Sequence, residues 1–326
     1  MNRFEFASPG TVESAVQLLG PTAVVLAGGT DLLSLLKDGV ATPERVVSLK
    51  GIRDLHGIED RGPDGVRIGA MVTVDELMES PVIRTAFPAL VQAADGIRSM
   101  QIRSVGTVGG DLCQRPRCWY FRNGFGLLAM REGKSMVPEG DNRYHAILGN
   151  GGPAFFVNPS SFAPALIALG AEVVIRGKQG TRRVPLETFY RVPKSDSERE
   201  YDLAVDEIVT EVLLPNPSGK KNAVYEVRQK EALDWPLTAA AVALQMDGDT
   251  VSAARVVLGH VAPIPWVSET AAQALVGKAV TAETAEAAGT AAVQDAKPLS
   301  RNAYKVKLAK TAVQRAVLRA AGKEVA

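Results

Sequence analysis

The sequence predicts an α+β fold in two units, and three observations lead to this prediction. Strand-like and helix-like segments alternate between residues 11 and 70, as in a small α/β unit. From about residue 222 the pattern changes to antiparallel strands with an Asp-Gly turn. An alanine-rich helical stretch and an amphipathic helix then close the chain. We place the boundary between the units near 215–222, in the turn-rich stretch PNPSGKKN.

Hydrophobic spacing and glycine positions predict the elements of the first unit. Apolar residues recur at helical spacing in 11–20, and Gly20 is expected to cap that helix. The same criteria predict strands at 24–27, 45–50 and 65–70, a helix at 30–39, and two helices within 74–95 that separate near Pro81.

The later segments are less regular. Residues 113–150 lack a clean period, which is typical of a functional or mobile stretch. A β-hairpin is expected at 171–186, and the charge run at 193–202 predicts a solvated loop. In the closing helix, 302–322, one face is apolar and the others are basic. The apolar face carries Leu308, Ala312, Val313 and Ala316, and the wet basic side carries Lys305, Lys307, Lys310 and Arg315.

Composition limits the classes of function. The apolar share of 46% and the charged share of 22% are ordinary for a globular protein. A formal net charge of +1 offers no electrostatic case for nucleic acid or an anionic membrane. No apolar run approaches the roughly 20 residues of a membrane span. Two cysteines favour a reducing compartment, so we expect a cytoplasmic protein, with export through a partner's signal left open.

A first glycine cluster, Ala27-Gly28-Gly29-Thr30-Asp31, lies where a strand passes into a helix. Glycine lacks the Cβ atom that keeps a ligand away from the backbone, and it adopts positive φ readily. The N–H groups of Gly29, Thr30 and Asp31 have no partner inside the helix they open, which favours an anion, most often a phosphate. The alternative is that Asp31 caps these donors locally. The cluster matches neither G-x-G-x-x-G nor a P-loop.

A second cluster, Gly106-Thr107-Val108-Gly109-Gly110-Asp111, is expected to form another anion site of free backbone N–H groups. Thr107 adds a hydroxyl group, and Gly109 and Gly110 add an unobstructed backbone. Taken alone, this stretch is more simply a tight turn between strands. Two such clusters in one α/β region favour a diphosphate that is held from two sides.

Longer motifs resemble a known family. LAGGTDLL, IRSVGTVGGDL and NPSSFAPALIALGAEV, in this order, resemble the FAD-binding medium subunits of molybdenum hydroxylases, the xanthine dehydrogenase family. LGHVAPIPW and PLSRNAYKVKLAK are similar to that family's C-terminal domain, so the match spans nearly the whole chain. CQRPRCWYFR followed by DNRYHAILG is most similar to periplasmic-type aldehyde oxidoreductases.

The resemblance implies a fold and a cofactor. It implies a PCMH-type (vanillyl-alcohol-oxidase-like) FAD-binding domain at 1–218, with subdomains at about 1–55 and 56–218 and an insertion at 113–150. A C-terminal CO-dehydrogenase-flavoprotein-like domain follows at 219–326. The cofactor is FAD. Its first segment corresponds to Val25, Leu26, Ala27, Gly28, Gly29, Thr30, Asp31 and Leu32, and its second to Thr107, Gly109, Gly110 and Asp111.

Several positions depart from the family pattern. The family often has Asn at position 111, and Asp111 lacks the amide donors, so we expect it to contact the ribityl chain. Ser161 stands where an aspartate is usual, and Glu226 stands where a lysine is common. Lys230 shares a strand face with Glu226 if the strand is regular, and whether it substitutes is open. The alternative is that Glu226 and Lys230 are ordinary surface residues of the strand.

The resemblance also raises the question of iron. The aldehyde oxidoreductase relatives carry a 4Fe–4S cluster in an insertion like 113–150, and a cubane needs four thiolates. This chain has only Cys113 and Cys118, and His145 would not complete the set. We therefore expect no metal site, but free buried thiols or an insertion kept for partner-facing aromatic residues, Trp119, Tyr120 and Phe121. His56 and His260 are expected to be structural.

These features predict an oxidoreductase: the FAD-carrying electron-transfer subunit of a heterotrimeric molybdenum hydroxylase. The resemblance implies a large subunit with the molybdenum cofactor, where an aldehyde or N-heterocycle is oxidised, and a small 2Fe–2S subunit that passes electrons to FAD. No general acid or base is predicted in this chain. Two alternatives are an FAD-less scaffold subunit of the same complex and a stand-alone flavin oxidoreductase.

Overall fold

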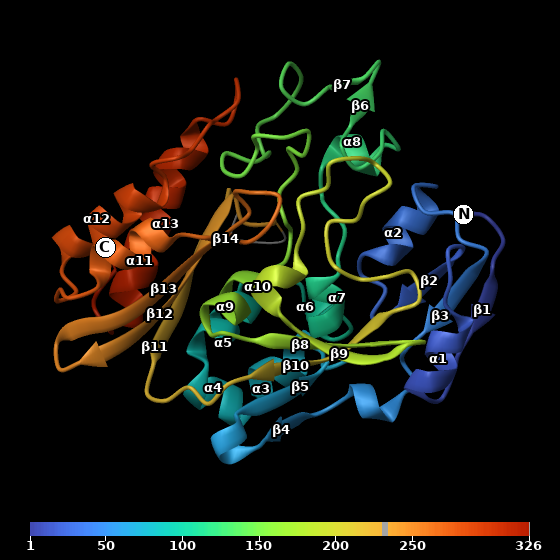
Figure 1. Ribbon diagram of the computed structural model, residues 1–326, viewed down its shortest axis with the longest axis horizontal. Helices are drawn as coiled ribbons and strands as arrows, with labels where there is room; N and C mark the ends of the chain where they lie inside the picture. Colours follow the sequence, from blue (N-terminus) through green and yellow to red (C-terminus); the bar gives the residue numbers. More distant parts are fainter. Residues whose placement is uncertain (230–233, 326) are drawn as a thin grey trace.

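A computed structural model describes residues 1–229 and 234–325. Figure 1 shows the N-terminal sheet at one end of the molecule, the C-terminal sheet and its helices at the other, and a central sheet between them. The irregular insertion projects from one side of this row. No helix in the described residues has both the length and the apolar character that crossing a bilayer requires.

The N-terminal sheet contains parallel strands in the order β1-β3-β2. Its strands are β1 (Glu5–Ala7), β2 (Ala23–Leu26) and β3 (Arg45–Ser48), and its helices are α1 (Val12–Leu18) and α2 (Leu32–Lys37). The alternation of strand and helix is confirmed, although β1 was not predicted. Helix α1 ends before Gly20 because Leu19 already has an extended backbone, so the predicted glycine cap is wrong.

The central sheet has the order β4-β5-β10-β8-β9, and its neighbours pair antiparallel. The strands are β4 (Ile58–Asp60), β5 (Val66–Gly69), β8 (Glu172–Gly177), β9 (Gly180–Pro185) and β10 (Ile208–Leu214). Short 3-10 turns at Arg53–Leu55 and Gly62–Asp64 flank β4. The hairpin of β8 and β9 confirms the prediction at 171–186.

Short helices cover this sheet and build the largest core. They are α3 (Val74–Glu79), α4 (Pro81–Ala86), α5 (Pro88–Asp95), α6 (Met100–Arg103), α7 (Val108–Leu112), α9 (Ala163–Ala168) and α10 (Leu186–Phe189). The stretch 74–95 forms three helices rather than two, because Pro88 as well as Pro81 begins a helix. Proline suits a first helical position, where its missing N–H would have no partner.

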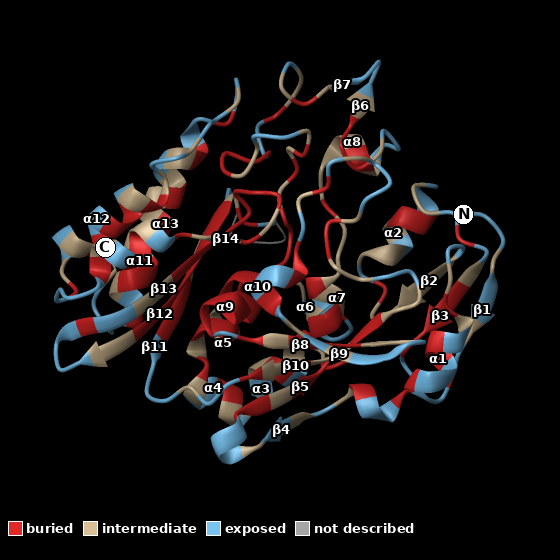
Figure 2. Ribbon diagram, in the orientation of Figure 1, coloured by how far each residue is buried: buried red, intermediate tan, exposed pale blue. Residues whose placement is uncertain are grey.

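The C-terminal unit is an antiparallel sheet packed on helices, as predicted. Its strands are β11 (Lys221–Val227), β12 (Thr238–Asp247), β13 (Thr250–Gly259) and β14 (Trp266–Val267), and its helices are α11 (Glu269–Leu275), α12 (Ala282–Ala292) and α13 (Tyr304–Ala320). Figure 2 shows buried residues along the faces that the sheet and helices share.

Helix α13 confirms most of its predicted apolar face and corrects its basic side. Ala312, Val313 and Ala316 are buried, while Leu308 is only partly so. Lys305, predicted on the wet side, is 1% exposed. Burial of this ammonium is tolerated because three backbone carbonyl oxygens accept hydrogen bonds from it.

The insertion contains little regular structure, in agreement with its sequence. Its elements are α8 (Trp119–Arg122), β6 (Met130–Arg131) and β7 (Lys134–Ser135). The charge run at 193–202 was predicted to be a solvated loop, and this is only partly correct. Glu200 is buried and pairs with Arg115 of the insertion. Tyr201 is also buried, and it bridges to Tyr190.

Candidate functional site

The two glycine clusters, which we call the first loop (27–31) and the second loop (106–111), lie against each other. A Cβ atom on Gly28 would overlap the carbonyl oxygen of Val105, which directly precedes the second loop. A Cβ atom on Gly110 would lie 3.8 Å from the Cβ of Ala27. The chain itself therefore requires a glycine at position 28, and the approach of a ligand to the backbone there stays a prediction.

The first loop presents free backbone donors. Gly29 has a φ of +85°, a left-handed conformation that favours glycine. None of the N–H groups of residues 28–32 donates a hydrogen bond to another group within the described residues, although the N–H of Leu33 bonds to the carbonyl of Gly29. Residues 28–32 also line one hollow. Adjacent free N–H groups of this kind bind anionic oxygen atoms.

The second loop does not repeat this arrangement. The N–H groups of Val108 and Gly109 bond to the carbonyls of Val72 and Ala70, and that of Gly110 bonds to the Thr107 hydroxyl oxygen. Thr107 is the N-cap of α7, so the stretch opens a helix and is not a turn between strands. The prediction of a second set of free donors is therefore wrong. The Thr107 hydroxyl group and the bare backbone remain as its contributions.

Two hollows meet at the loops. The first hollow lies against β2 and the first loop and is also lined by Thr107, Gly109 and Gly110. The second hollow lies between the loops, α6 and the segment around Trp235. Both share one set of residues, Thr30, Asp31, Thr107, Gly110 and Gln114. An elongated ligand could therefore extend from one hollow into the other past the free donors of the first loop.

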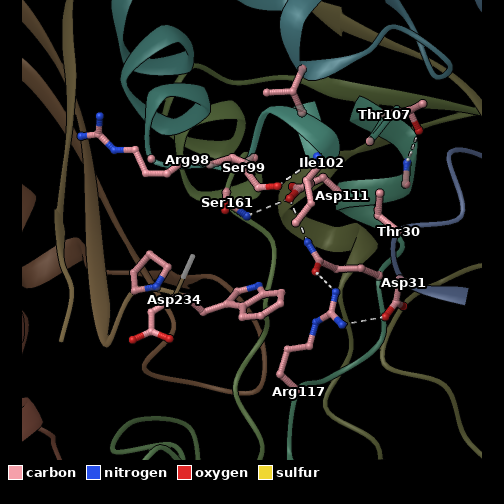
Figure 3. A pocket seen from close by; sticks show the side chains of 18 of the residues that line it. Thr30, Asp31, Arg98, Ser99, Ile102, Thr107, Asp111, Arg117, Ser161 and Asp234 are labelled. Carbon is pink, nitrogen blue, oxygen red and sulfur yellow. Dashed lines mark hydrogen bonds and ion pairs between the residues drawn. The ribbon is translucent and has the colours of Figure 1, made fainter. Parts of the chain in front are cut away.

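The Asp31 carboxylate connects the first loop to the insertion. It pairs with Arg117 at 3.1 Å and Arg122 at 2.7 Å, and it accepts the N–H of Arg115 at 2.8 Å. In Figure 3 the Arg117 side chain extends toward Asp31 along the second hollow. The Asp31 side chain makes no capping hydrogen bond to α2, so the alternative that Asp31 caps these donors locally is wrong. These cations offset a negative charge that would otherwise oppose an anion beside the loop.

Asp111 fastens the second loop to the start of α9. One carboxylate oxygen accepts the amide of Gln114 at 2.8 Å and the N–H of Ser161 at 3.1 Å. The other accepts the N–H of Phe162 at 3.0 Å and the hydroxyl group of Ser160. Burial raises the pKa of Asp111, while these hydrogen bonds oppose the rise. Figure 3 shows Ser161 beside Asp111 at the wall of the second hollow.

Glu226 lies apart from both hollows. It is a β11 residue whose carboxylate pairs with Arg228 and packs against Gly96. Burial raises the pKa of Glu226, and the charge of Arg228 opposes that rise. Lys230, the other residue predicted on this strand face, lies outside the described residues.

The remaining predicted site residues lie at or near the loops. Those that line the first hollow are Val25, Ala27, Gly28, Gly29, Thr30, Asp31, Leu32, Thr107, Gly109 and Gly110; Leu26 ends β2 beside them. Sequence reasoning missed Arg98, Gln114, Arg117, Arg228 and Trp235, which line the second hollow. Arg228 follows β11 and Arg117 lies in the aperiodic insertion, so no periodic signal marked either of them.

The two cysteines face different cavities. Cys113 lines the first hollow, whereas Cys118 lines a separate cavity, where its Sγ lies 3.2 Å from Nε2 of His145. Both are free thiols of intermediate burial. Among the described residues, His, Cys, Asp and Glu side chains nowhere gather in a group of three or more suited to a metal ion. Apolar residues, Phe121, Leu127, Leu128, Ala154 and Phe156, cluster in and beside the insertion.

Comparisons with known proteins agree with these features. Residues 2–217 match the model of the FAD binding domain in molybdopterin dehydrogenase, and residues 223–320 match that of the CO dehydrogenase flavoprotein C-terminal domain. The chain is 31% identical to the carbon monoxide dehydrogenase medium chain of Hydrogenophaga pseudoflava, over 97% of this chain and 96% of that one. It is 32% identical to the aldehyde oxidoreductase FAD-binding subunit PaoB of Escherichia coli, over 89% of each. A solved structure of carbon monoxide dehydrogenase from Hydrogenophaga pseudoflava superposes with a TM-score of 0.78 at 30% identity and covers 98% of both chains.

Proposed function

The chain belongs to the family of FAD-binding subunits of molybdopterin dehydrogenases, and from this premise we propose how its hollows hold FAD. It is an oxidoreductase subunit whose cofactor is FAD and whose role is electron transfer. The observation that carries the proposed placement is the row of unpaired N–H groups at residues 28–32, next to the second loop.

The donors and hollows fit the parts of FAD. We assign the diphosphate to the N–H groups of the first loop and the Thr107 hydroxyl group. The adenosine half is assigned to the first hollow, whose wall includes Val25, Ala27 and Leu32. The flavin half is assigned to the second hollow, beside Ser161. Leu26, Gly109 and Gly110 shape the backbone around the diphosphate.

Two of the predicted contacts receive modified roles, and a third is unchanged. We propose that Asp111 positions the Ser160–Phe162 turn rather than binding the ribityl chain, because protein donors already occupy both of its oxygen atoms. We propose that Glu226 acts through Arg228, which lines the second hollow. A contact between Lys230 and the flavin stays a prediction.

Bound FAD supplies the redox step, because a flavin can take up and release electrons one or two at a time. The chain supplies binding and electrostatics. Arg98, Arg117 and Arg228 line the second hollow together with Asp31, Asp111 and Asp234, so charges of both signs surround the assigned flavin. No described side chain is assigned a role as general acid or base.

The partners are a finer proposal. We propose a molybdenum-cofactor large subunit that oxidises an aldehyde or N-heterocycle, and a small 2Fe–2S subunit that passes electrons to this chain. Relatives are named as medium chains of carbon monoxide dehydrogenase, and one related solved structure is titled a Cu,Mo-CO dehydrogenase. We also propose a cytoplasmic location, supported by the two unpaired thiols. We also propose that the boundary between the two domains lies between residues 218 and 219.

Flavin content is the first test. Purified full chain should contain about one FAD per chain, because the first and second hollows together are assigned to a single FAD. The FAD content is read from flavin absorbance after denaturation. Folded chain that does not take up FAD would point to the scaffold alternative. The stand-alone alternative would instead appear as turnover of an aldehyde without partners. With both partners present, the aldehyde should bleach the flavin band, and omission of the small subunit should prevent this.

A further inference from the structure

One basic side chain of the first hollow, that of Arg199, has no carboxylate partner in the described residues. Arg199 is partly buried and belongs to the segment 193–202, between α10 and β10. None of the ion pairs within residues 1–229 and 234–325 includes it. The other basic residue that lines this hollow, Arg115, pairs with the buried Glu200. The positive charge of Arg199 is therefore available to a ligand in the first hollow.

The two carboxylates that line the same hollow have partners of their own. Asp31 pairs with two arginine side chains of the insertion. Glu207 accepts two hydrogen bonds of 2.8 Å from Arg182. Because other arginines already offset both negative charges, the guanidinium group of Arg199 is the uncompensated charge that an anion in this hollow would meet.

Contacts through the insertion tie the segment of Arg199 to the first loop. The N–H of Arg115 donates to the Asp31 carboxylate at 2.8 Å, and the Arg115 guanidinium group pairs with Glu200. Glu200 lies in sequence between Arg199 and Tyr201, and both of these neighbours line the first hollow. The free N–H groups of the first loop line this hollow as well. The same hollow thus contains unpaired backbone donors and an unpaired cation.

Tyr201 orients the guanidinium group. Its hydroxyl oxygen accepts a hydrogen bond of 3.1 Å from Nη2 of Arg199, whose Cζ lies 5.0 Å from the centre of the Tyr201 ring. Tyr201 is 5% exposed and stacks on Phe189, with 3° between the ring planes. Burial raises the pKa of Tyr201 to about 12, so the phenol is neutral and leaves the charge of Arg199 uncompensated. Most N–H donors of the guanidinium group remain for ligand oxygen atoms.

We propose that Arg199 binds the diphosphate of the cofactor and supplies the positive charge that offsets it. The N–H groups of the first loop provide hydrogen bonds to phosphate oxygens, but they carry no net charge. A guanidinium group adds that charge and can bond to two phosphate oxygens at once. Arg199 therefore completes the diphosphate site from the segment 193–202. This inference rests on the proposed placement of the diphosphate at the first loop.

Isothermal titration of FAD-free full chain with FAD, and separately with ADP, tests this role. ADP contains the adenosine and diphosphate groups without the flavin. We expect Arg199→Met to bind both ligands about tenfold more weakly than wild type, because a charged hydrogen-bond donor is lost. The titrations are repeated at ionic strengths of about 0.01 and 0.1 M, since salt screens charge–charge attraction over this range. The affinity of Arg199→Met should depend less on ionic strength than that of wild type.

Two further variants serve as controls. Arg199→Lys keeps the charge but not the planar group, so it should keep the salt dependence and bind both ligands more tightly than Arg199→Met. Arg183→Met removes the same charge at an exposed position that does not line the first hollow, and it should bind like wild type. Circular dichroism establishes that each variant is folded.

The outcomes separate this inference from the proposed function. Folded Arg199→Met that binds FAD and ADP as tightly as wild type would overturn the role of Arg199 alone. A loss of affinity with the salt dependence of wild type would also overturn it, because Arg199 would then act only through packing on Tyr201. Wild-type chain that binds neither ligand would overturn both proposals. Wild-type chain that binds ADP through Arg199 but takes up no FAD would contradict only the proposed function.

Discussion

The carbonyl oxygen of Val105 lies against the Cα atom of Gly28, in the space that any larger residue would fill with its side chain. This contact brings together two loops that are about 80 residues apart in sequence. It sets the first loop, with its free N–H groups, beside Thr107. The assigned diphosphate site therefore depends on one backbone packing contact.

Replacement of Gly28 by alanine should separate the loops. The added methyl group would overlap backbone atoms that cannot rotate away, so we expect a loss of about 1–3 kcal/mol in the free energy of unfolding. FAD content should fall as well. Thermal unfolding and flavin absorbance measure the two effects. Gly20→Ala is the matched control, because a Cβ atom there meets no atom within 4 Å. Normal FAD content in Gly28→Ala would show that loop packing does not govern binding.

Asp31→Asn should loosen the insertion. The change removes the carboxylate charge that Arg117 and Arg122 share, and both guanidinium groups are mostly buried. We expect the protein to lose about 2 kcal/mol of stability. Limited proteolysis should also cut residues 113–150 sooner than in wild type. Asp38→Asn, at an exposed helix end, should leave the cleavage pattern unchanged. An unaltered pattern in both variants would contradict the proposed anchoring role.

Lys305→Met should destabilise the C-terminal unit. Methionine has a similar volume but no donor, so three carbonyl groups lose their shared partner. The relief of a buried charge offsets part of this loss, and we expect a net cost of about 2 kcal/mol. Burial lowers the pKa of Lys305 to about 7. Urea unfolding should therefore be measured near pH 6, where the Lys305 amine is protonated in the folded chain. Lys307→Met, at an exposed position on the same helix, should be neutral. Equal unfolding midpoints for both variants would argue against a stabilising role for the three hydrogen bonds that Lys305 donates.

Stability should fall on mild acidification because of His145 and His260. Burial lowers the pKa of His145 from 6.5 to about 4 and that of His260 from 6.5 to about 3. Below pH 6.5 the unfolded chain therefore binds more protons at these residues than the folded chain does. Each histidine should cost up to about 1.4 kcal/mol per pH unit as the pH falls through that range.

The measurement is the free energy of unfolding in urea between about pH 6.5 and 5.5, below the range in which Lys305, whose pKa is about 7, loses its proton and above that in which most carboxyl groups titrate. His145→Phe should reduce the slope of stability against pH by about half, since one of two neutral buried rings is gone. The same slope in wild type and variant would mean that His145 takes up its proton equally well in the folded state.

Local signals in the sequence predicted many of the elements. The Asp-Gly turn predicted the β12–β13 hairpin, and the glycine pair at 28 and 29 predicted a break between strand and helix. The family motifs predicted FAD, and residues 2–217 match the FAD binding domain of molybdopterin dehydrogenase. Each of these features depends on residues that are near one another in the chain.

The sequence by itself thus determined the two-unit α+β fold, the family and the position of the glycine loops. Only the tertiary structure decided the burial of Lys305, the pairing of Asp31 with the insertion, and the saturation of Asp111 by donors at the start of α9. A charged residue has the same local pattern whether it faces water or a distant partner. The partners arrive from segments tens of residues away, and spacing along the chain carries no record of which polar groups the fold will bring together.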